Sequence, residues 1–198
     1  HLSVDNSFIT TYYINYPPFF KFVEDFNSNL HTASICNWDP INDYIVQNHT
    51  DYKLNVSSDQ DVSLQASAYL SNNDPDVMFL HFDDVDHAGH ADGFSPNVSQ
   101  YITAIEGVDS YISPIIQSIS QRPDYVNEDW LILITTDHGG LGTSHGGNSI
   151  EEENVFVIAS GNNIPQNIIR RDSSLIFDSV YNCFADTVEL QFDGVDDY

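Results

Sequence analysis

Two stretches of this 198-residue chain place acidic residues, histidines and glycines directly after an apolar run. The first, FLHFDDVDHAGHADG, covers residues 79–93, and the second, TTDHGGLGTSHGG, covers residues 135–147. Carboxylate and imidazole groups together suit Zn²⁺ or Mn²⁺, whereas Ca²⁺ prefers a shell made of oxygen atoms alone. The two stretches therefore predict a metal site of the zinc or manganese type.

Five side chains in these stretches are candidate metal ligands: Asp86, His90, Asp137, His138 and His145. A single four-coordinate catalytic zinc ion would use fewer protein ligands, because it keeps one position open for water or substrate. Two metal ions are therefore predicted, and ions about 4 Å apart typically serve phosphoryl or related transfer. Three further residues are candidates for supporting the ligands or contacting substrate: Asp83, Asp84 and Trp38.

The glycines next to the histidines are predicted to shape the chain around the metal. Adjacent residues of a regular strand point to opposite faces, so Asp137 and His138 can approach one ion only if the backbone bends. Gly139 and Gly140 permit such a bend. The pair at 146–147 is expected to let the chain return so that His145 also reaches the site.

The elements that carry these residues follow from the pattern of apolar side chains. Four short apolar runs predict strands at 32–38, 76–82, 130–136 and 154–160. Helical patterns lie at 17–30, 58–73, 95–121 and 173–188. This alternation predicts an α/β fold with a mainly parallel sheet and helices on both faces. Ligands of such sheets bind at the carboxyl ends of the strands, which is where both histidine-rich stretches begin.

Composition narrows the class of partner. Thirty acidic residues against five basic ones give a net charge of −25, which disfavours nucleic-acid polymers and anionic membranes. No apolar stretch reaches the roughly 20 residues of a membrane span. The acidity fits a secreted, periplasmic or extracellular protein, and the first residue, His1, indicates a processed or partial chain. Cys36 and Cys183 are too few for a disulfide framework and are interpreted as buried thiols.

The motifs DDVDHAGHADG, TTDHGG and SHGG, in this order, resemble the alkaline phosphatase superfamily, most closely its type I phosphodiesterase/nucleotide pyrophosphatase branch. The resemblance spans residues 1 to about 188 and implies a phosphoester hydrolase with two divalent ions, Zn²⁺ or else Mn²⁺. It implies one ion held by Asp86, His90 and His145. It implies a second held by Asp137, His138, an upstream Asp and a Ser or Thr nucleophile that forms a covalent intermediate with phosphorus.

The chain departs from this family at its beginning, where neither the upstream Asp nor the nucleophile is found. HLSVDNSF resembles the stretch that soon follows the nucleophile, so the missing part is expected just before His1, and the chain alone is expected to be inactive. Thr10, Thr11 and Ser34 are interpreted as loop or strand hydroxyls. Residues 189–198 resemble the first strand of a laminin-G-like jelly-roll domain, which predicts a further domain after residue 188.

Three alternatives stay open on the sequence alone. A sulfatase or a phosphomonoesterase of the same superfamily would share the metal platform and differ around the nucleophile. A non-catalytic calcium-binding or adhesion module would use the acidic loops but not the histidines. The expected partner is a small anionic phosphoester, and neither its identity nor the oligomeric state is encoded in these motifs.

Overall fold

The computed structural model describes residues 13, 15–162, 164–165, 168–169 and 188–192. Contacts divide the chain into two units, residues 1–88 with 102–123 and residues 89–101 with 124–198. The chain passes from one unit to the other within helix α4 (Asp84–Asp92) and again within helix α5 (Ser99–Ser120). Among the described residues, no helix combines the length and the apolar character that crossing a bilayer requires.

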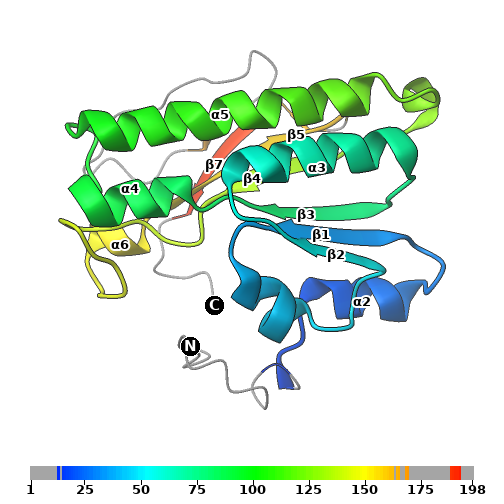
Figure 1. The fold of residues 1–198 in the computed structure, drawn as a ribbon, viewed down its shortest axis with the longest axis horizontal. Helices are drawn as coiled ribbons and strands as arrows, with labels where there is room; N and C mark the ends of the chain where they lie inside the picture. Colours follow the sequence, from blue (N-terminus) through cyan, green and yellow to red (C-terminus); the bar gives the residue numbers. More distant parts are fainter. Residues whose placement is uncertain (1–12, 14, 163, 166–167, 170–187, 193–198) are drawn as a thin grey trace. The chain divides into compact units, whose positions relative to one another are not determined.

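The first unit is built on a parallel sheet of three strands in the order β2-β1-β3 (Figure 1). The strands are β1 (Thr32–Cys36), β2 (Tyr52–Asn55) and β3 (Val77–His81). The central strand β1 pairs in parallel with both neighbours, and all five of its residues are buried. The α/β class and the parallel sheet predicted from the sequence are therefore confirmed.

Successive residues of a strand point to opposite sides of a sheet, and helices pack against both sides of this one. On one face of β1, the Ser34 hydroxyl donates to Asn42 Oδ1 of the π-helix η1 (Ile41–Val46) over 2.6 Å. Phe79, in register with Ser34, meets Phe19 of α2 (Phe19–Phe26) on this same face. Helix α3 (Asp59–Asn72) lies across the other face (Figure 1).

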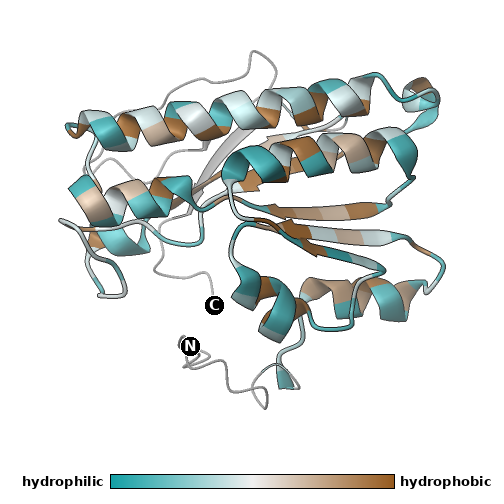
Figure 2. Ribbon diagram, viewed as in Figure 1, coloured by the Kyte–Doolittle hydropathy of each residue, from teal (hydrophilic) through white to brown (hydrophobic). Residues whose placement is uncertain are grey.

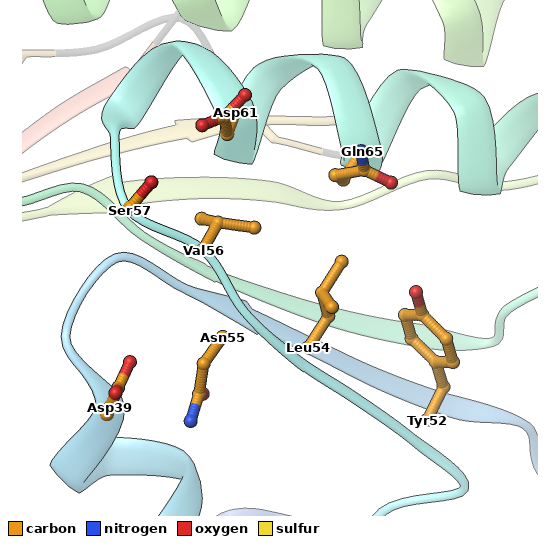
Figure 3. Close-up of a pocket in the computed structure, with 8 residues that line it drawn as sticks. All are labelled: Asp39, Tyr52, Leu54, Asn55, Val56, Ser57, Asp61 and Gln65. Atoms are coloured by element: carbon orange, nitrogen blue, oxygen red, sulfur yellow. The ribbon is translucent and has the colours of Figure 1, made fainter.

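Helix α3 is stabilised by a cap at its start and by one buried apolar face. The Ser58 side chain accepts a hydrogen bond from the Asp61 amide, which caps the helix start. Val62, Ala66 and Leu70 recur every four residues and are buried, so one face of the helix packs into the core. The brown and teal residues of α3 in Figure 2 show this division between apolar and polar positions.

Two elements of the first unit were not predicted. Strand β2 has only four residues, YKLN, and its mixed composition gives no clear period. The π-helix η1 depends on a tertiary contact, because the Asn42 amide donates to the Leu54 carbonyl at 3.1 Å and to Asn55 Oδ1 at 2.7 Å. Strand β2 therefore forms through pairing with β1, and η1 through contacts with β2, rather than through a local signal.

Arg122 joins the end of α5 to the end of α3 and gives a first prediction. Its guanidinium donates to the carbonyls of Leu70 at 3.0 Å and Asn73 at 3.1 Å and also binds Asp74. Because the Arg122 side chain is only 8% exposed, R122A should lower the free energy of unfolding by about 2 kcal/mol through the lost carbonyl bonds. Urea unfolding followed by circular dichroism measures this change.

The matched control for Arg122 is D74N. The Asp74 side chain is 89% exposed, and ion pairs in water contribute little, so D74N should unfold close to the wild-type midpoint. If R122A unfolded at the wild-type midpoint, the carbonyl bonds would not stabilise the junction of the two helices.

Cys36 is a buried free thiol, as the sequence predicted. Burial raises its pKa to about 11, with the Asp39 carboxylate acting in the same direction and the Ser34 hydroxyl opposing it. The thiol therefore stays protonated up to pH values near 10, and the thiolate is the reactive form. In a C183S chain, iodoacetamide at pH 8 should label Cys36 only after denaturant is added, as mass spectrometry would report; labelling of the folded chain would contradict this.

The second unit contains a four-stranded sheet in the order β4-β5-β7-β6. Strand β5 (Val155–Ser160) pairs antiparallel with β4 (Ile132–Thr135) and with β7 (Val188–Phe192), and β7 pairs in parallel with β6 (Ile168–Ile169). The continuous apolar runs had been expected in parallel strands, so the antiparallel β4–β5 pair corrects that expectation. An apolar run indicates burial but not strand direction.

Two predictions fall at the end of this unit. The predicted helix at 173–188 lies, except for its last residue, outside the described residues. Residues 188–192 form a strand that pairs with β5 and β6, so Val188, the last residue of the predicted helix, is not helical. The assignment of residues 189–198 to a further domain stays a prediction.

Candidate metal centre

The first histidine-rich stretch lies largely on helix α4, which begins three residues after β3 ends. The helix places Asp86 and His90 four residues apart, so the two side chains share one helix face, one turn from each other. The sequence placed these residues at the end of a strand but did not predict the helix. An i, i+4 pair on a helix is a common way of presenting two ligands to one ion.

The start of α4 is held by a residue that the sequence did not single out, Asp59. Its side chain is completely buried and accepts hydrogen bonds from the backbone amides of Asp83 at 2.7 Å and Asp84 at 2.9 Å. It also accepts from the Asn37 side chain at 2.8 Å. In the sequence, Asp59 is an ordinary acidic residue in the first turn of α3. Nothing in its spacing indicates that it also binds the start of α4.

Asp83 and Asp84 lie beside this buried carboxylate. Burial raises the pKa of both side chains, and the negative charge of Asp59 acts in the same direction. The Asp83 carboxylate is 3.2 Å from Nε2 of His87, whose side chain is 71% exposed. The Asp83 carboxylate therefore contacts a surface histidine. That Asp83 or Asp84 orients the imidazole of a metal ligand stays a prediction.

In the second unit, three of the five predicted ligands come together. The ring centroids of His138 and His145 lie 3.8 Å apart in a stacked arrangement, and those of His90 and His145 lie 4.9 Å apart. We call these residues, His90, His138 and His145, the histidine cluster. They come from α4 and from the loop after β4, two segments far apart in the sequence.

Hydrogen bonds orient two rings of the histidine cluster for coordination. Nδ1 of His90 lies 2.9 Å from the Thr143 carbonyl, and Nδ1 of His138 lies 2.8 Å from the Gly139 carbonyl. A carbonyl oxygen only accepts, so Nδ1 carries the proton and the lone pair of each neutral ring is on Nε2. Metal-binding histidines are oriented by such bonds, so the cluster suits a divalent cation of the zinc type.

Phe94 packs against two rings of the histidine cluster and was not predicted. Its ring meets His90 at 5.4 Å and His145 at 6.0 Å, both in edge-to-face geometry. A Cβ atom on Gly140 would lie 2.3 Å from this ring, which leaves no room for any side chain there. The Phe94 amide also donates to the Gly142 carbonyl at 2.7 Å. Phe94 therefore joins the α4 side of the cluster to the loop after β4.

The chain bends at residue 137, and Gly139 and Gly140 are required there for a reason that was not predicted. Among the described glycines, only Gly93, Gly142 and Gly146 have positive φ, so Gly139 and Gly140 do not provide a left-handed bend. A Cβ on Gly139 would lie 2.0 Å from the Glu151 carbonyl oxygen, so space rather than backbone freedom requires glycine. Gly146, with φ of +94°, does provide the turn that was expected after His145.

The other predicted residues are not members of the histidine cluster. Asp137 is 85% exposed at its side chain and accepts from the His138 amide at 3.1 Å. In the first unit, Trp38 is half-buried, with its ring 6.3 Å from that of His81. Ser34 is buried and donates to Asn42, as expected of a strand hydroxyl, while Thr10 and Thr11 lie outside the described residues.

Comparison with known proteins shows which family this chain resembles. A family model described as type I phosphodiesterase / nucleotide pyrophosphatase matches residues 3–175. The human protein "GPI ethanolamine phosphate transferase 2, catalytic subunit" is 30% identical over 123 residues, which cover 61% of this chain. The chain spans 12% of the length of that relative.

Proposed function

Because the chain belongs to the type I phosphodiesterase / nucleotide pyrophosphatase family, we propose that it is part of a metal-dependent hydrolase that cleaves phosphate diesters. The family consists of phosphoryl-transfer and hydrolase enzymes. The observation that carries the proposal is the histidine cluster, in which backbone carbonyls hold two rings with Nε2 as the coordinating nitrogen. An acidic adhesion module that binds calcium has no use for such nitrogen ligands.

The proposed ligands divide between two ions. Asp86, His90 and His145 would hold one ion, and Asp137 and His138, with an Asp upstream of His1, would hold the other. Imidazole and carboxylate groups together favour Zn²⁺, with Mn²⁺ as the second choice. The ions would supply Lewis-acid stabilisation of the charge that develops on the phosphoryl oxygens.

The chain's own residues would orient these ligands and shape the entrance. The Thr143 and Gly139 carbonyls fix the rings of His90 and His138 before substrate arrives, which reduces the cost of ordering them. Phe94 restricts the rotation of His90 and His145. Trp38, two residues after β1, stays a candidate for substrate contact.

The nucleophile is proposed to be a Ser or Thr hydroxyl upstream of His1, because HLSVDNSF resembles the stretch that follows it in this family. The substrate is proposed to be a small anionic phosphoester and not a nucleic-acid polymer, since the chain carries a net charge of −25. The same acidity favours a secreted or periplasmic location.

A second candidate is transfer of the phosphoryl-containing group to an alcohol instead of water. The similarity to a protein named as an ethanolamine phosphate transferase favours it. The two reactions share the metal centre and the covalent intermediate and differ only in the acceptor. Residues of the acceptor pocket therefore decide between them.

The test uses the protein extended upstream of His1 and loaded with Zn²⁺. Turnover of bis-p-nitrophenyl phosphate well above that of p-nitrophenyl phosphate supports the diesterase, and the reverse order indicates a phosphomonoesterase. Hydrolysis of p-nitrophenyl sulfate in preference to both esters would show a sulfatase instead. Adding ethanolamine distinguishes the acceptors, because a transferase forms a new ester that mass spectrometry detects. Absence of turnover with every ester would reject the proposed activity.

A further inference from the structure

A buried carboxylate, Asp59, lies where three elements of the first unit meet. It is the first residue of α3, it contacts Asn37 directly after β1, and it binds the backbone at the start of α4. Its side chain has no exposed surface. Burying a charged group is costly unless hydrogen bonds compensate, so its presence requires an explanation.

The hydrogen bonds of Asp59 use the two oxygens of a carboxylate. Oδ1 accepts from the Asn37 side chain and from the Asp83 amide, and Oδ2 accepts from the Asp84 amide. All three partners are N–H donors. An Asn side chain at this position would offer one acceptor oxygen, and its NH₂ group would face an N–H donor. Only a carboxylate can accept from all three donors.

The position of these bonds determines what they control. The amides at the start of a helix have no partner within the helix, and the helix dipole favours a negative charge there. The Asp83 carboxylate contacts His87. The amides at the start of α4 are bound instead by Asp59, which belongs to α3. The first turn of α4 is thereby tied to α3 and to the end of β1.

We propose that Asp59 is a positioning residue for the metal centre, because it fixes the first turn of α4 and with it the direction of Asp86 and His90. This inference rests on the proposed function, in which these two residues are ligands of one ion. Ligand geometry tolerates displacements of only about 0.5 Å, so a helix start that is free to shift would weaken coordination. Asp59 itself contacts neither substrate nor ion.

The test measures Co²⁺ binding to the chain through the visible absorption bands of the bound ion. D59N has almost the same shape as the wild type and replaces one acceptor by a donor. It should bind Co²⁺ about 10- to 100-fold more weakly and with an altered band shape, as expected when a residue that orients ligands is lost. D61N is the matched control, since it removes a charge from the same turn of α3 without touching α4, and it should match the wild type.

The outcomes separate this inference from the proposed function. A folded D59N chain, judged by circular dichroism, with wild-type affinity and band shape would overturn the positioning role and leave the metal centre intact. A wild-type chain without cobalt bands, or bands that are unchanged in H90A, would overturn both. If D59N does not fold, D59E replaces it, because it keeps the carboxylate and shifts its oxygens away from the two α4 amides. D59E should also weaken binding, and unchanged binding would overturn the inference.

Discussion

Replacing His138 by alanine should weaken Zn²⁺ binding by at least about 100-fold, since residues that merely orient a ligand already contribute about 10- to 100-fold. The reason is that Nδ1 of His138 is held by the Gly139 carbonyl, so the ring presents Nε2 without further ordering. Competition with a chromophoric chelator measures the affinity of each variant. H90A and H145A should show losses of the same order for the other proposed ion, which these two side chains would hold together with Asp86.

The matched control for the histidine cluster is H87A. His87 lies on α4 between two proposed ligands, but its side chain is 71% exposed and contacts Asp83. Removing it should leave Zn²⁺ affinity near the wild-type value. Equal affinities for H138A and H87A would show that the cluster does not bind the ion. A chain that binds calcium and no zinc would favour the adhesion module.

G139A should destabilise the second unit by about 3 kcal/mol, the upper end of the usual cost of overpacking. An added Cβ would lie 2.0 Å from the Glu151 carbonyl oxygen and 3.0 Å from that of Asn154, and both are backbone atoms that cannot rotate away. The Gly139 amide also donates to the Glu152 carbonyl at 2.8 Å, so a shift would weaken this bond. Because His138 is the preceding residue, Zn²⁺ affinity should fall as well.

Fluorescence of Trp130 in a W38F background follows unfolding of the second unit, since the chain has two tryptophans and Trp130 belongs to that unit. The control is G107A, which adds a Cβ in helix α5 where no atom lies within 4 Å and is followed by circular dichroism, because Gly107 belongs to the first unit. It should stabilise the chain by about 0.5–1 kcal/mol, because alanine loses less conformational freedom in a helix than glycine. A G139A midpoint equal to that of the wild type would contradict the close approach of the Glu151 carbonyl.

The parts of the fold that could be predicted are those with a strong local signal. The strands β1, β3, β4 and β5 coincide with continuous apolar runs, and α3 and α5 follow from apolar spacing and, for α3, a Ser cap. Strand β2 and helix α4 were not predicted. The first is short and mixed in composition, and the second is rich in Asp, Gly and His, which are weak helix formers. Its start depends on Asp59, a contact that no local pattern shows.

For the candidate site, the sequence alone determined the type of chemistry. The residue types and the order of DVDHAGH, TTDHGG and SHGG indicate nitrogen and oxygen ligands for a metal and the phosphodiesterase family, because coordination depends on which atoms are present. Only the tertiary structure decided how those atoms are held. The contact of Phe94 with His145, the Thr143 carbonyl that binds Nδ1 of His90, and the bonds of Asp59 to the start of α4 join residues distant in sequence. Such contacts depend on packing and leave no periodic trace along the chain.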